Sequence, residues 1–448
     1  MSPERKYIRY NKKHTNVLRA ASILIKNGQL IDPENDINAK LDIFIDNGKV
    51  VEIAGSINKK AKTTIDAKGK LVTPGLVDMH VHLREPGRED KETIQSATNA
   101  AAKGGVTTLL SMPNTTPAVD SQDIIKYIKE SIKKTAKVNV EISGAITIAR
   151  DGEILTDIAA LKKEGVIAIT DDGASVDDKA LFLKALKESK KHGILVIEHC
   201  EDTSLSKNGS VNLGLTSTRM GLRGISNESE YKRIARDIEL AEKTSSRIHI
   251  AHVSCKESVD IIRKAKKKKV NITAETAPHY FSFTESDVLG FDTNFKMNPP
   301  LRSAEDKKAV IEGLQDNTID VIASDHAPHT ENEKDIEFDR AEFGIIGLET
   351  ELSAGVMELI DKGFLTWESL IKKLSVNPSK ILGLDKGSLA KGSIADCVII
   401  DPDSEWVYSK DTILSKSDNS PFINKPLKAE VVYTIVKGKI VYERKVSK

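Results

Sequence analysis

Short apolar runs and amphipathic stretches alternate along most of the chain. The apolar runs are rich in β-branched residues and end in polar residues, a pattern that predicts buried strands. The eight expected strands span residues 76–82, 106–112, 140–148, 166–170, 194–199, 248–253, 271–275 and 320–324. Apolar residues recur at helical spacing over residues 92–103, 121–134, 155–163, 179–191, 229–244, 256–267, 304–314, 348–362 and 367–374. Eight β/α units predict an α/β fold with a (β/α)₈ TIM-like barrel, and a doubly wound open sheet is the alternative.

The two ends of the chain have a different sequence pattern. Both contain short alternating strands, and the first end carries Asn-Gly pairs, typical of hairpin turns, at residues 27–28 and 47–48. We expect the two ends to build one small β-sandwich domain beside the barrel. The chain then divides into a flexible polar extension (1–16), a first β-sandwich part (17–72), the barrel (73–385) and a second β-sandwich part (386–448).

Composition excludes several classes of function. Among 448 residues, 67 Lys and Arg balance 66 Asp and Glu, so the net charge of +1 gives no electrostatic basis for binding nucleic acid. No apolar stretch approaches the roughly 20 residues that span a membrane, and no apolar signal core begins the chain, so we expect a cytoplasmic protein. The three cysteines are odd in number and widely spaced, which argues against a disulfide framework.

His80, His82 and Arg84 stand two residues apart at the end of the first expected strand. Residues at this spacing project from the same face of a strand. Neutral imidazole is a good zinc ligand, so the two histidines predict half of a metal site. The guanidinium beyond them suits a carboxylate, which it can bind through two parallel hydrogen bonds.

Four further strand ends carry an aspartate or a histidine. Asp171 and Asp172 follow the fourth strand, His199 ends the fifth, His252 ends the sixth and Asp325 ends the eighth. Taken singly, the aspartates suit a turn or a helix cap, and the histidines suit hydrogen-bonded core positions. The carboxyl ends of barrel strands meet at one rim, however, and five strand ends with such residues favour a metal site there.

The ligand set indicates two divalent metal ions. Imidazoles and carboxylates without a thiolate suit zinc. Six ligands exceed the needs of one tetrahedral zinc, whereas two ions about 3.5–4 Å apart that share a bridging carboxylate would use them all. The residues leave open whether Asp171 or Asp172 is the bridge. Asp325 is expected to take a proton from the attacking hydroxide and pass it to a leaving nitrogen, so the reaction class is hydrolysis of an amide or its reverse.

Three longer motifs resemble those of a known family. They are His80-Val81-His82-Leu83-Arg84-Glu85-Pro86-Gly87, Asn114-Thr115-Thr116-Pro117 and Ser324-Asp325-His326-Ala327-Pro328-His329. With these motifs, the chain resembles the class I dihydroorotases of the amidohydrolase superfamily over residues 21–446. The His-x-His pair is shared by the whole superfamily, whereas the three motifs together are strongly specific. The resemblance implies zinc-dependent, reversible cyclisation of N-carbamoyl-L-aspartate to L-dihydroorotate in de novo pyrimidine (UMP) biosynthesis.

The resemblance also implies a role for each site residue. One zinc would be held by His80, His82 and Asp325 and the other by His199 and His252, with Asp172 as the bridge. The carboxylate of the substrate would be bound by Arg84, Asn114 and His329, although Asn114 equally suits a turn before Pro117. The pyrimidine ring would meet Asn298 and the backbone at Phe343 and Gly344.

Related enzymes and a scaffold are the alternatives. Hydantoinases, dihydropyrimidinases and allantoinases usually bridge their metals with a carboxylated lysine after the fourth strand, and residues 168–173 offer no lysine. Arg84 also favours a substrate that carries a carboxylate. A non-catalytic scaffold that binds aspartate transcarbamoylase is an alternative of another class, which the complete ligand set disfavours. Further expectations about partners are a homo-oligomer and an active enzyme associated with aspartate transcarbamoylase.

Overall fold

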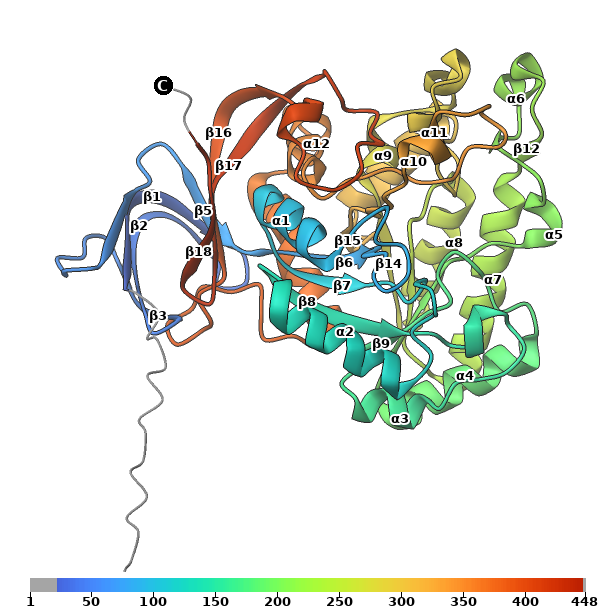
Figure 1. The fold of residues 1–448 in the computed structure, drawn as a ribbon, viewed down its shortest axis with the longest axis horizontal. Helices are drawn as coiled ribbons and strands as arrows, with labels where there is room; N and C mark the ends of the chain where they lie inside the picture. Colours follow the sequence, from blue (N-terminus) through green and yellow to red (C-terminus); the bar gives the residue numbers. More distant parts are fainter. Residues whose placement is uncertain (1–21, 446–448) are drawn as a thin grey trace, which may run out of the picture.

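The computed structural model describes residues 22–445, which form a barrel and a β domain (Figure 1). The extension expected at residues 1–16 lies outside the described residues. Eight parallel strands follow one another around the barrel in chain order, from β6 to β15. The main-chain N–H of His82 donates to the carbonyl oxygen of His326 at 2.9 Å, beside a parallel bridge between Val81 and His326, and so links the first strand to the last. The expected (β/α)₈ barrel is confirmed.

Each of the eight expected strands overlaps one barrel strand. The observed strands are β6 (Leu76–Val81), β7 (Val106–Ser111), β8 (Asn139–Gly144), β9 (Ala168–Ile169), β10 (Leu195–Glu198), β13 (Ile248–Ile250), β14 (Ile272–Thr276) and β15 (Val321–Ile322). Most are shorter than the apolar runs that predict them. Burial continues past the end of β15, but the backbone leaves the ladder and turns at Asp325, where φ is +47°.

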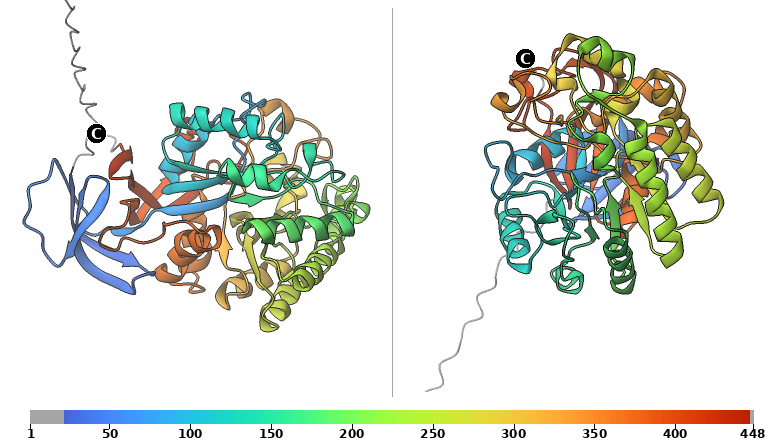
Figure 2. Two further views of the ribbon diagram at one scale, coloured as in Figure 1. Left: turned by 90° about the horizontal axis from the view of Figure 1, so that it is seen from below. Right: turned by 90° about the vertical axis from the view of Figure 1, so that its right-hand side faces the viewer.

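Helices surround the barrel (Figure 2). The seven expected between the strands are all present, as α1 (Ile94–Gly104), α2 (Gln122–Thr135), α3 (Ile158–Lys163), α4 (Lys179–His192), α7 (Asn227–Thr244), α8 (Lys256–Lys267) and α10 (Ala304–Gln315). The two expected after the last strand each contain a π-helical part. They are α12 (Glu351–Gly355) with η4 (Val356–Ile360), and α13 (Trp367–Ile371) with η5 (Lys372–Val376), followed by α14 (Asn377–Leu382).

Several short elements beyond the strand ends were not predicted. After β10 come α5 (Thr203–Ser206), β11 (Val211–Asn212), α6 (Leu215–Met220) and β12 (Gly224–Ile225), and β11 pairs with β12. Others are η1 (Ile148–Arg150), α9 (Pro278–Ser282), η2 (Glu285–Gly290), η3 (Thr293–Phe295) and α11 (Glu331–Lys334). Buried Arg302 links β11 and β12, since its Nη1 donates to Asn212 Oδ1 and to the Ile225 carbonyl oxygen, both at 2.9 Å.

The two ends of the chain together build a separate β domain, as expected, and its strands form one sheet. Its strands are β1 (Ile23–Asp32), β2 (Ile37–Asp46), β3 (Lys49–Ala54), β4 (Thr63–Asp66), β5 (Leu71–Pro74), β16 (Cys397–Val407), β17 (Pro426–Val436) and β18 (Lys439–Glu443). Their order is β18-β17-β16-β5-β1-β2-β3, and β4 adds to β1. The sheet encloses a core of its own, which includes Ile25, Leu30, Ile43 and Ile435.

One expected turn in this domain is wrong. Asn47-Gly48 does join β2 to β3, but Asn27-Gly28 lies inside β1, where the pairing with β2 shifts register. A Cβ at Gly28 would lie 2.6 Å from Cγ2 of Val72. The glycine therefore serves a bulge that lets β5 approach closely, and not a hairpin turn.

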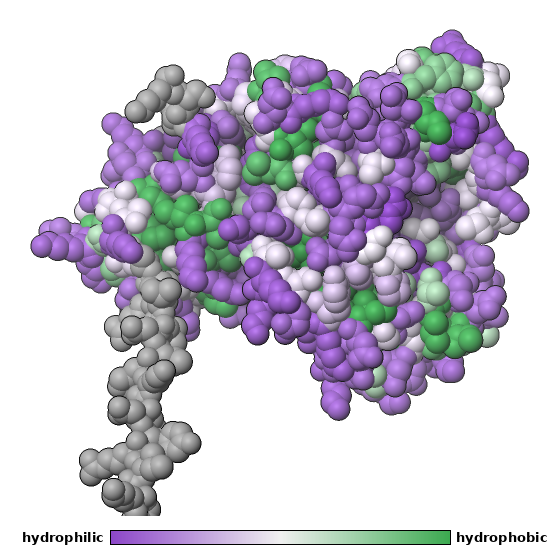
Figure 3. Space-filling view, in the orientation of Figure 1, coloured by the Kyte–Doolittle hydropathy of each residue, from purple (hydrophilic) through white to green (hydrophobic). Residues whose placement is uncertain are grey.

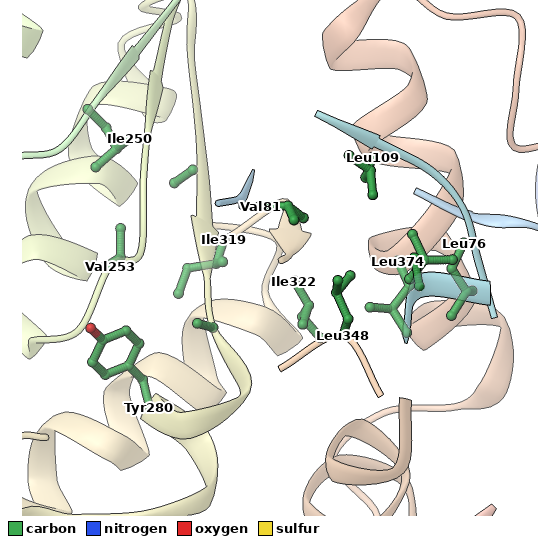
Figure 4. Close-up of a cluster of buried hydrophobic side chains, with 14 of the residues drawn as sticks. Leu76, Val81, Leu109, Ile250, Val253, Tyr280, Ile319, Ile322, Leu348 and Leu374 are labelled. Carbon is green, nitrogen blue, oxygen red and sulfur yellow. The ribbon is translucent and has the colours of Figure 1, made fainter. Parts of the chain in front are cut away.

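Two apolar clusters support the barrel. The larger joins strands to the segments around them, and Figure 4 shows part of it, with Val81, Leu109 and Ile322 near Leu348 and Leu374. A smaller cluster joins residues from β6, β7, β9, β10 and β15 to Ile381 and Leu382 of α14. Because its members come from several strands around the barrel, this cluster fills part of the interior.

Hydrophilic side chains predominate on the face in Figure 3, and hydrophobic ones form smaller patches. Within residues 22–445, no helix combines the length and apolar character needed to cross a membrane.

Candidate active site and metal centre

The six expected metal ligands gather at the carboxyl ends of five barrel strands. His80 lies in β6 and His82 just after it, and Asp172, His199, His252 and Asp325 follow β9, β10, β13 and β15. All six side chains are buried. Their ligand atoms include two compact groups, one of His80, His82 and Asp172 and the other of Asp172, His199 and His252, each within 4.8 Å. Asp172 belongs to both groups, which is the position of a bridging carboxylate.

Asp171 faces away from these groups. Its Oδ1 accepts hydrogen bonds from the main-chain N–H groups of Ile146 at 2.8 Å and Thr147 at 3.1 Å. Its Oδ2 accepts the hydroxyl of Thr147. Asp171 therefore ties the end of β9 to the segment after β8. Of the two aspartates that the sequence left open, Asp172 is the one beside the histidines.

Asp325 lies next to the first ligand group. Its Oδ1 is 3.2 Å from Nε2 of His82 and 3.6 Å from Nε2 of His80. Asp325 and His252 have φ angles of +47° and +37°, in the left-handed region that side chains other than glycine rarely adopt. Such strain costs about 1–3 kcal/mol per residue and is concentrated at functional sites.

Three of the four imidazoles are held from behind by an oxygen atom. The pairs are His80 Nδ1 with Glu275 Oε1 at 2.6 Å, His82 Nδ1 with Asn114 Oδ1 at 2.8 Å, and His199 Nε2 with Glu201 Oε2 at 3.1 Å. An oxygen that accepts the outer N–H leaves the inner nitrogen with a lone pair. Outer oxygens of this kind are typical of metal-binding histidines.

The charges at the centre suit a bound cation. Burial disfavours the charged form of His80, but Asp172, Glu275 and Asp325 outweigh burial and hold the pKa of His80 well above its usual range. Burial also opposes ionisation of Asp172, yet the nearby imidazoles of His80 and His252 hold its pKa well below the usual range. His80 Nε2 is 3.2 Å from Asp172 Oδ1 but has no hydrogen-bond partner among residues 22–445. This buried, unpartnered nitrogen beside a carboxylate fits a divalent metal ion.

The six expected substrate-binding residues line one cavity with the ligands. The cavity has a volume of about 240 Å³, and His82, Asp172, His199, His252 and Asp325 form part of its wall. The rest includes Arg84, Asn114, Asn298, His329, Phe343 and Gly344. His80 is fully buried beneath it.

Arg84 is fixed within this wall. Its Nε donates to the carbonyl oxygen of Pro328 at 3.1 Å, and its Nη2 lies 3.3 Å from His329 Nε2. Burial lowers the pKa of Arg84 to about 10, so the guanidinium stays charged at neutral pH. The cavity therefore presents one permanent cation to an anionic group of a ligand.

Asn114 and Asn298 each share their amide with another site residue. The Asn114 oxygen bonds His82, which leaves its NH₂ group for a ligand. The Asn298 NH₂ group donates to Glu201 Oε2 at 2.9 Å, and that same oxygen bonds His199. Both amides thus connect the cavity wall to a histidine of the metal centre.

Asn419 joins two loops of the cavity from a distant part of the chain. It lies between β16 and β17, and its side chain is buried. Its Oδ1 accepts the main-chain N–H of His329 at 3.0 Å, and its Nδ2 donates to the carbonyl oxygens of Ala327 and Gly344, each at 3.0 Å. The C-terminal part of the chain therefore supports the cavity.

Sequence reasoning missed Glu275, Glu201 and Asn419. Glu275 ends the seventh expected strand, so the rule that found the other strand ends could have found it. Glu201 lies two residues after His199 and offered a weaker signal of the same kind. Asn419 lies outside the barrel sequence, and no local pattern points to it.

The family model and the curated relatives agree on one family, and the solved structures share the fold. A family model described as Dihydro-orotase-like matches residues 69–258. The chain is 51% identical to the dihydroorotase of Elusimicrobium minutum, across 94% of this chain and 97% of that protein. It is 49% identical to the dihydroorotase of Geobacter metallireducens, across 94% of this chain and 100% of that protein. Among solved structures, L-hydantoinase (dihydropyrimidinase) from Arthrobacter aurescens superposes with a TM-score of 0.85 at 26% identity, across 94% of this chain and 96% of that one.

Proposed function

Because the chain belongs to the dihydroorotase family, we propose that it interconverts N-carbamoyl-L-aspartate and L-dihydroorotate, the reaction of de novo pyrimidine synthesis. The observation that carries the proposal is the charged head group of Arg84 in the same 240 Å³ cavity as the buried ligand groups. Both compounds carry a carboxylate close to the amide bond that forms or breaks. A cavity with a fixed guanidinium beside a metal centre suits such a molecule.

We propose zinc as the metal, with two ions per subunit. His80, His82 and Asp325 would hold one ion, His199 and His252 the other, and Asp172 would lie between them. When bound, such a pair activates water and polarises a carbonyl group. The imidazole and carboxylate donors, and the compact arrangement of the two groups, support this stoichiometry.

Asp325 would carry the proton of the reaction. In hydrolysis, the Asp325 carboxylate would take a proton from the attacking water and deliver it to the ring nitrogen as the C–N bond breaks. In ring closure, a protonated Asp325 would start the reverse sequence. Its position supports this role, because Oδ1 lies beside His82 and the side chain also lines the cavity.

Arg84, His329 and the free NH₂ group of Asn114 would bind the carboxylate of the substrate. The ring would meet Asn298 and the backbone at Phe343 and Gly344. These groups would hold the amide bond close to Asp325. Such positioning lowers the barrier by restricting the reactants before the chemical step.

Class I membership is also part of the proposal. Residues 168–173 contain Asp172 and no lysine, so a side-chain carboxylate would bridge the metals without modification. A cytoplasmic location, a homo-oligomer and an association with aspartate transcarbamoylase stay predictions.

A turnover comparison tests the function. Zinc-loaded protein is assayed with dihydroorotate, hydantoin, dihydrouracil and allantoin, with metal content measured on the same samples. We expect turnover of dihydroorotate in clear preference to the three compounds that lack its carboxylate. Preference for hydantoin or dihydrouracil would favour a related cyclic amidohydrolase. No bound metal and no turnover of any compound would favour a scaffold.

A further inference from the structure

Lys91 places a buried cation directly behind His329. It lies between β6 and α1, and only 5% of its surface is exposed. Its Nζ lies 3.1 Å from Nδ1 of His329 and 2.9 Å from Oε1 of Glu333. Lys91 thus contacts the Nδ1 edge of the imidazole ring, which is turned away from Arg84.

The chemistry of the two groups decides which nitrogen of His329 carries the proton. An ammonium group has three donors and no acceptor, whereas a neutral imidazole has one donor and one acceptor. Lys91 and Arg84 are both donors only, so a neutral His329 can accept from just one of them. The contact of Lys91 with Nδ1, at 3.1 Å, is shorter than that of Arg84 with Nε2, at 3.3 Å, which favours a proton on Nε2. His329 is neutral at ordinary pH, because burial and the charges of Arg84, Lys91 and Lys334 lower its pKa to about 2.

Glu333 offers the competing arrangement. Its Oε2 lies 3.5 Å from His329 Nδ1 and could accept a proton held there. That distance is longer than the one to Lys91, and the same oxygen already accepts the main-chain N–H of Thr330 at 3.0 Å. The shorter contact with Lys91 favours the Nε2–H form.

At the opposite edge of the ring, two hydrogen-bond donors lie side by side. Nε2 of His329 and Nη2 of Arg84 are 3.3 Å apart, and both residues line the cavity. If both atoms carry protons they do not bond each other, and instead suit an anion with two acceptor oxygens. The backbone of His329 is held in this position because its main-chain N–H donates a hydrogen bond to Asn419.

We propose that Lys91 is a positioning residue for substrate binding, which keeps the His329 proton on Nε2 so that His329 and Arg84 together bind the substrate carboxylate. The inference rests on the proposed dihydroorotase function for its substrate. The state of the imidazole, however, can be measured without any substrate.

Kinetics with a matched pair of variants test the role in binding. Lys91→Met removes the donor behind His329, and Arg88→Met removes another cation that binds the same Glu333 carboxylate at 2.6 Å without contacting His329. We expect Lys91→Met to raise the KM for dihydroorotate about tenfold, the effect of one lost hydrogen bond to a charged group, with kcat within about threefold. Arg88→Met should leave both constants within about twofold, and Lys91→Arg should restore most of the KM. An equal rise of KM in Lys91→Met and Arg88→Met would overturn the proposal, because anchoring of Glu333 would then explain it.

Nitrogen NMR reads the imidazole directly. Zinc-loaded protein labelled with ¹⁵N-histidine is compared with His329→Gln to assign the ring signals. We expect a protonated Nε2 and an unprotonated Nδ1 in the wild-type protein, and a share of protonated Nδ1 in Lys91→Met. A wild-type proton on Nδ1 would overturn the inference, even in a protein that turns over dihydroorotate. A wild-type Nε2–H in a protein that does not turn over dihydroorotate would instead remove the proposed function and leave the control by Lys91 standing.

Discussion

Nδ1 of His80 lies 2.6 Å from Oε1 of Glu275, and the other oxygen of that carboxylate lies 3.1 Å from Nε2 of His249. All three side chains are buried. The carboxylate therefore fixes the orientation of His80 and keeps its Nε2 directed at Asp172. Support of a ligand from behind raises its basicity and restricts its rotation, and both effects strengthen metal binding.

Glu275→Gln should weaken metal binding about 10–100-fold, the usual effect of losing such a partner. Competition with a chelator, followed by metal analysis, measures the affinity. Glu351→Gln is the matched control, because Glu351 is buried in the same barrel and burial raises its pKa well above the usual range. Burial favours the neutral form of its carboxyl group, so the isosteric amide should leave metal affinity unchanged. Equal losses in the two variants would mean that Glu275 has no special relation to His80.

Asp325→Asn should remove turnover while most of the metal stays bound. The amide cannot take up a proton, and loss of an acid-base group typically costs 10²–10⁴-fold in rate. Each of the two compact ligand groups consists of three residues without Asp325, so both survive the substitution. Turnover of dihydroorotate and metal content are measured on the same preparation. A rate within tenfold of the wild type would exclude Asp325 as the proton carrier.

Gly344→Ala should raise the KM for dihydroorotate and leave metal content unchanged. At φ +135°, a Cβ there would lie 2.7 Å from the Ala327 Cβ and 3.2 Å from His329 Nε2, so it would crowd the expected carboxylate site. Gly392→Ala is the control, since Gly392 also has a positive φ, of +96°, but nothing within 4 Å of the new Cβ. It should cost about 1 kcal/mol of stability without a change in KM. A similar KM in the two variants would show that crowding at Gly344 is unimportant.

His279 should make the protein sensitive to acid. Burial lowers its pKa to about 4, and neither ring nitrogen has a hydrogen-bond partner within the described part of the chain. An unfolded histidine has a pKa of about 6.5, so the unfolded chain binds the proton more strongly between these values. The free energy of unfolding therefore falls as pH drops from 6.5 towards 4, by about 2 kcal/mol at pH 5 from this residue alone.

Urea unfolding at pH 7 and pH 5 measures this loss. His279→Phe removes the titrating group and should lose about 2 kcal/mol less than the wild type over that interval. His192→Gln changes a partly exposed histidine at the end of α4. This variant should lose as much free energy of unfolding as the wild type between pH 7 and pH 5. If His279→Phe loses as much free energy of unfolding between pH 7 and pH 5 as the wild type, other groups cause the sensitivity to acid.

Local patterns predicted the barrel and its rim because each depends on residues that are close in sequence. The period of two that placed His80 beside His82, and the polar residues after β9, β10, β13 and β15, needed no knowledge of distant contacts. Asn27-Gly28 was misread because a bulge and a turn require the same backbone freedom. The elements between residues 203 and 226 are only two to six residues long, so no regular period marks them.

The partners of the site residues were harder to predict. Glu275 bonds a histidine 195 residues away, and Asn419 bonds His329 from 90 residues away. No pattern in a short window contains such pairs. Asn114 was expected to bind substrate, but its amide oxygen bonds His82 and only its NH₂ group is left for a ligand. Only the folded geometry shows this arrangement.

The place of Asn419 in the chain has a consequence for synthesis on the ribosome. All six expected metal ligands, and all eight barrel strands, precede residue 326 and leave the ribosome first. The loops that carry His329 and Gly344 gain their shared partner only when the segment between β16 and β17 follows, after all eight barrel strands have been made. A nascent chain could therefore fold its barrel before it can hold a substrate, and a chain cut before residue 419 would keep the metal ligands but lose the brace of the substrate site.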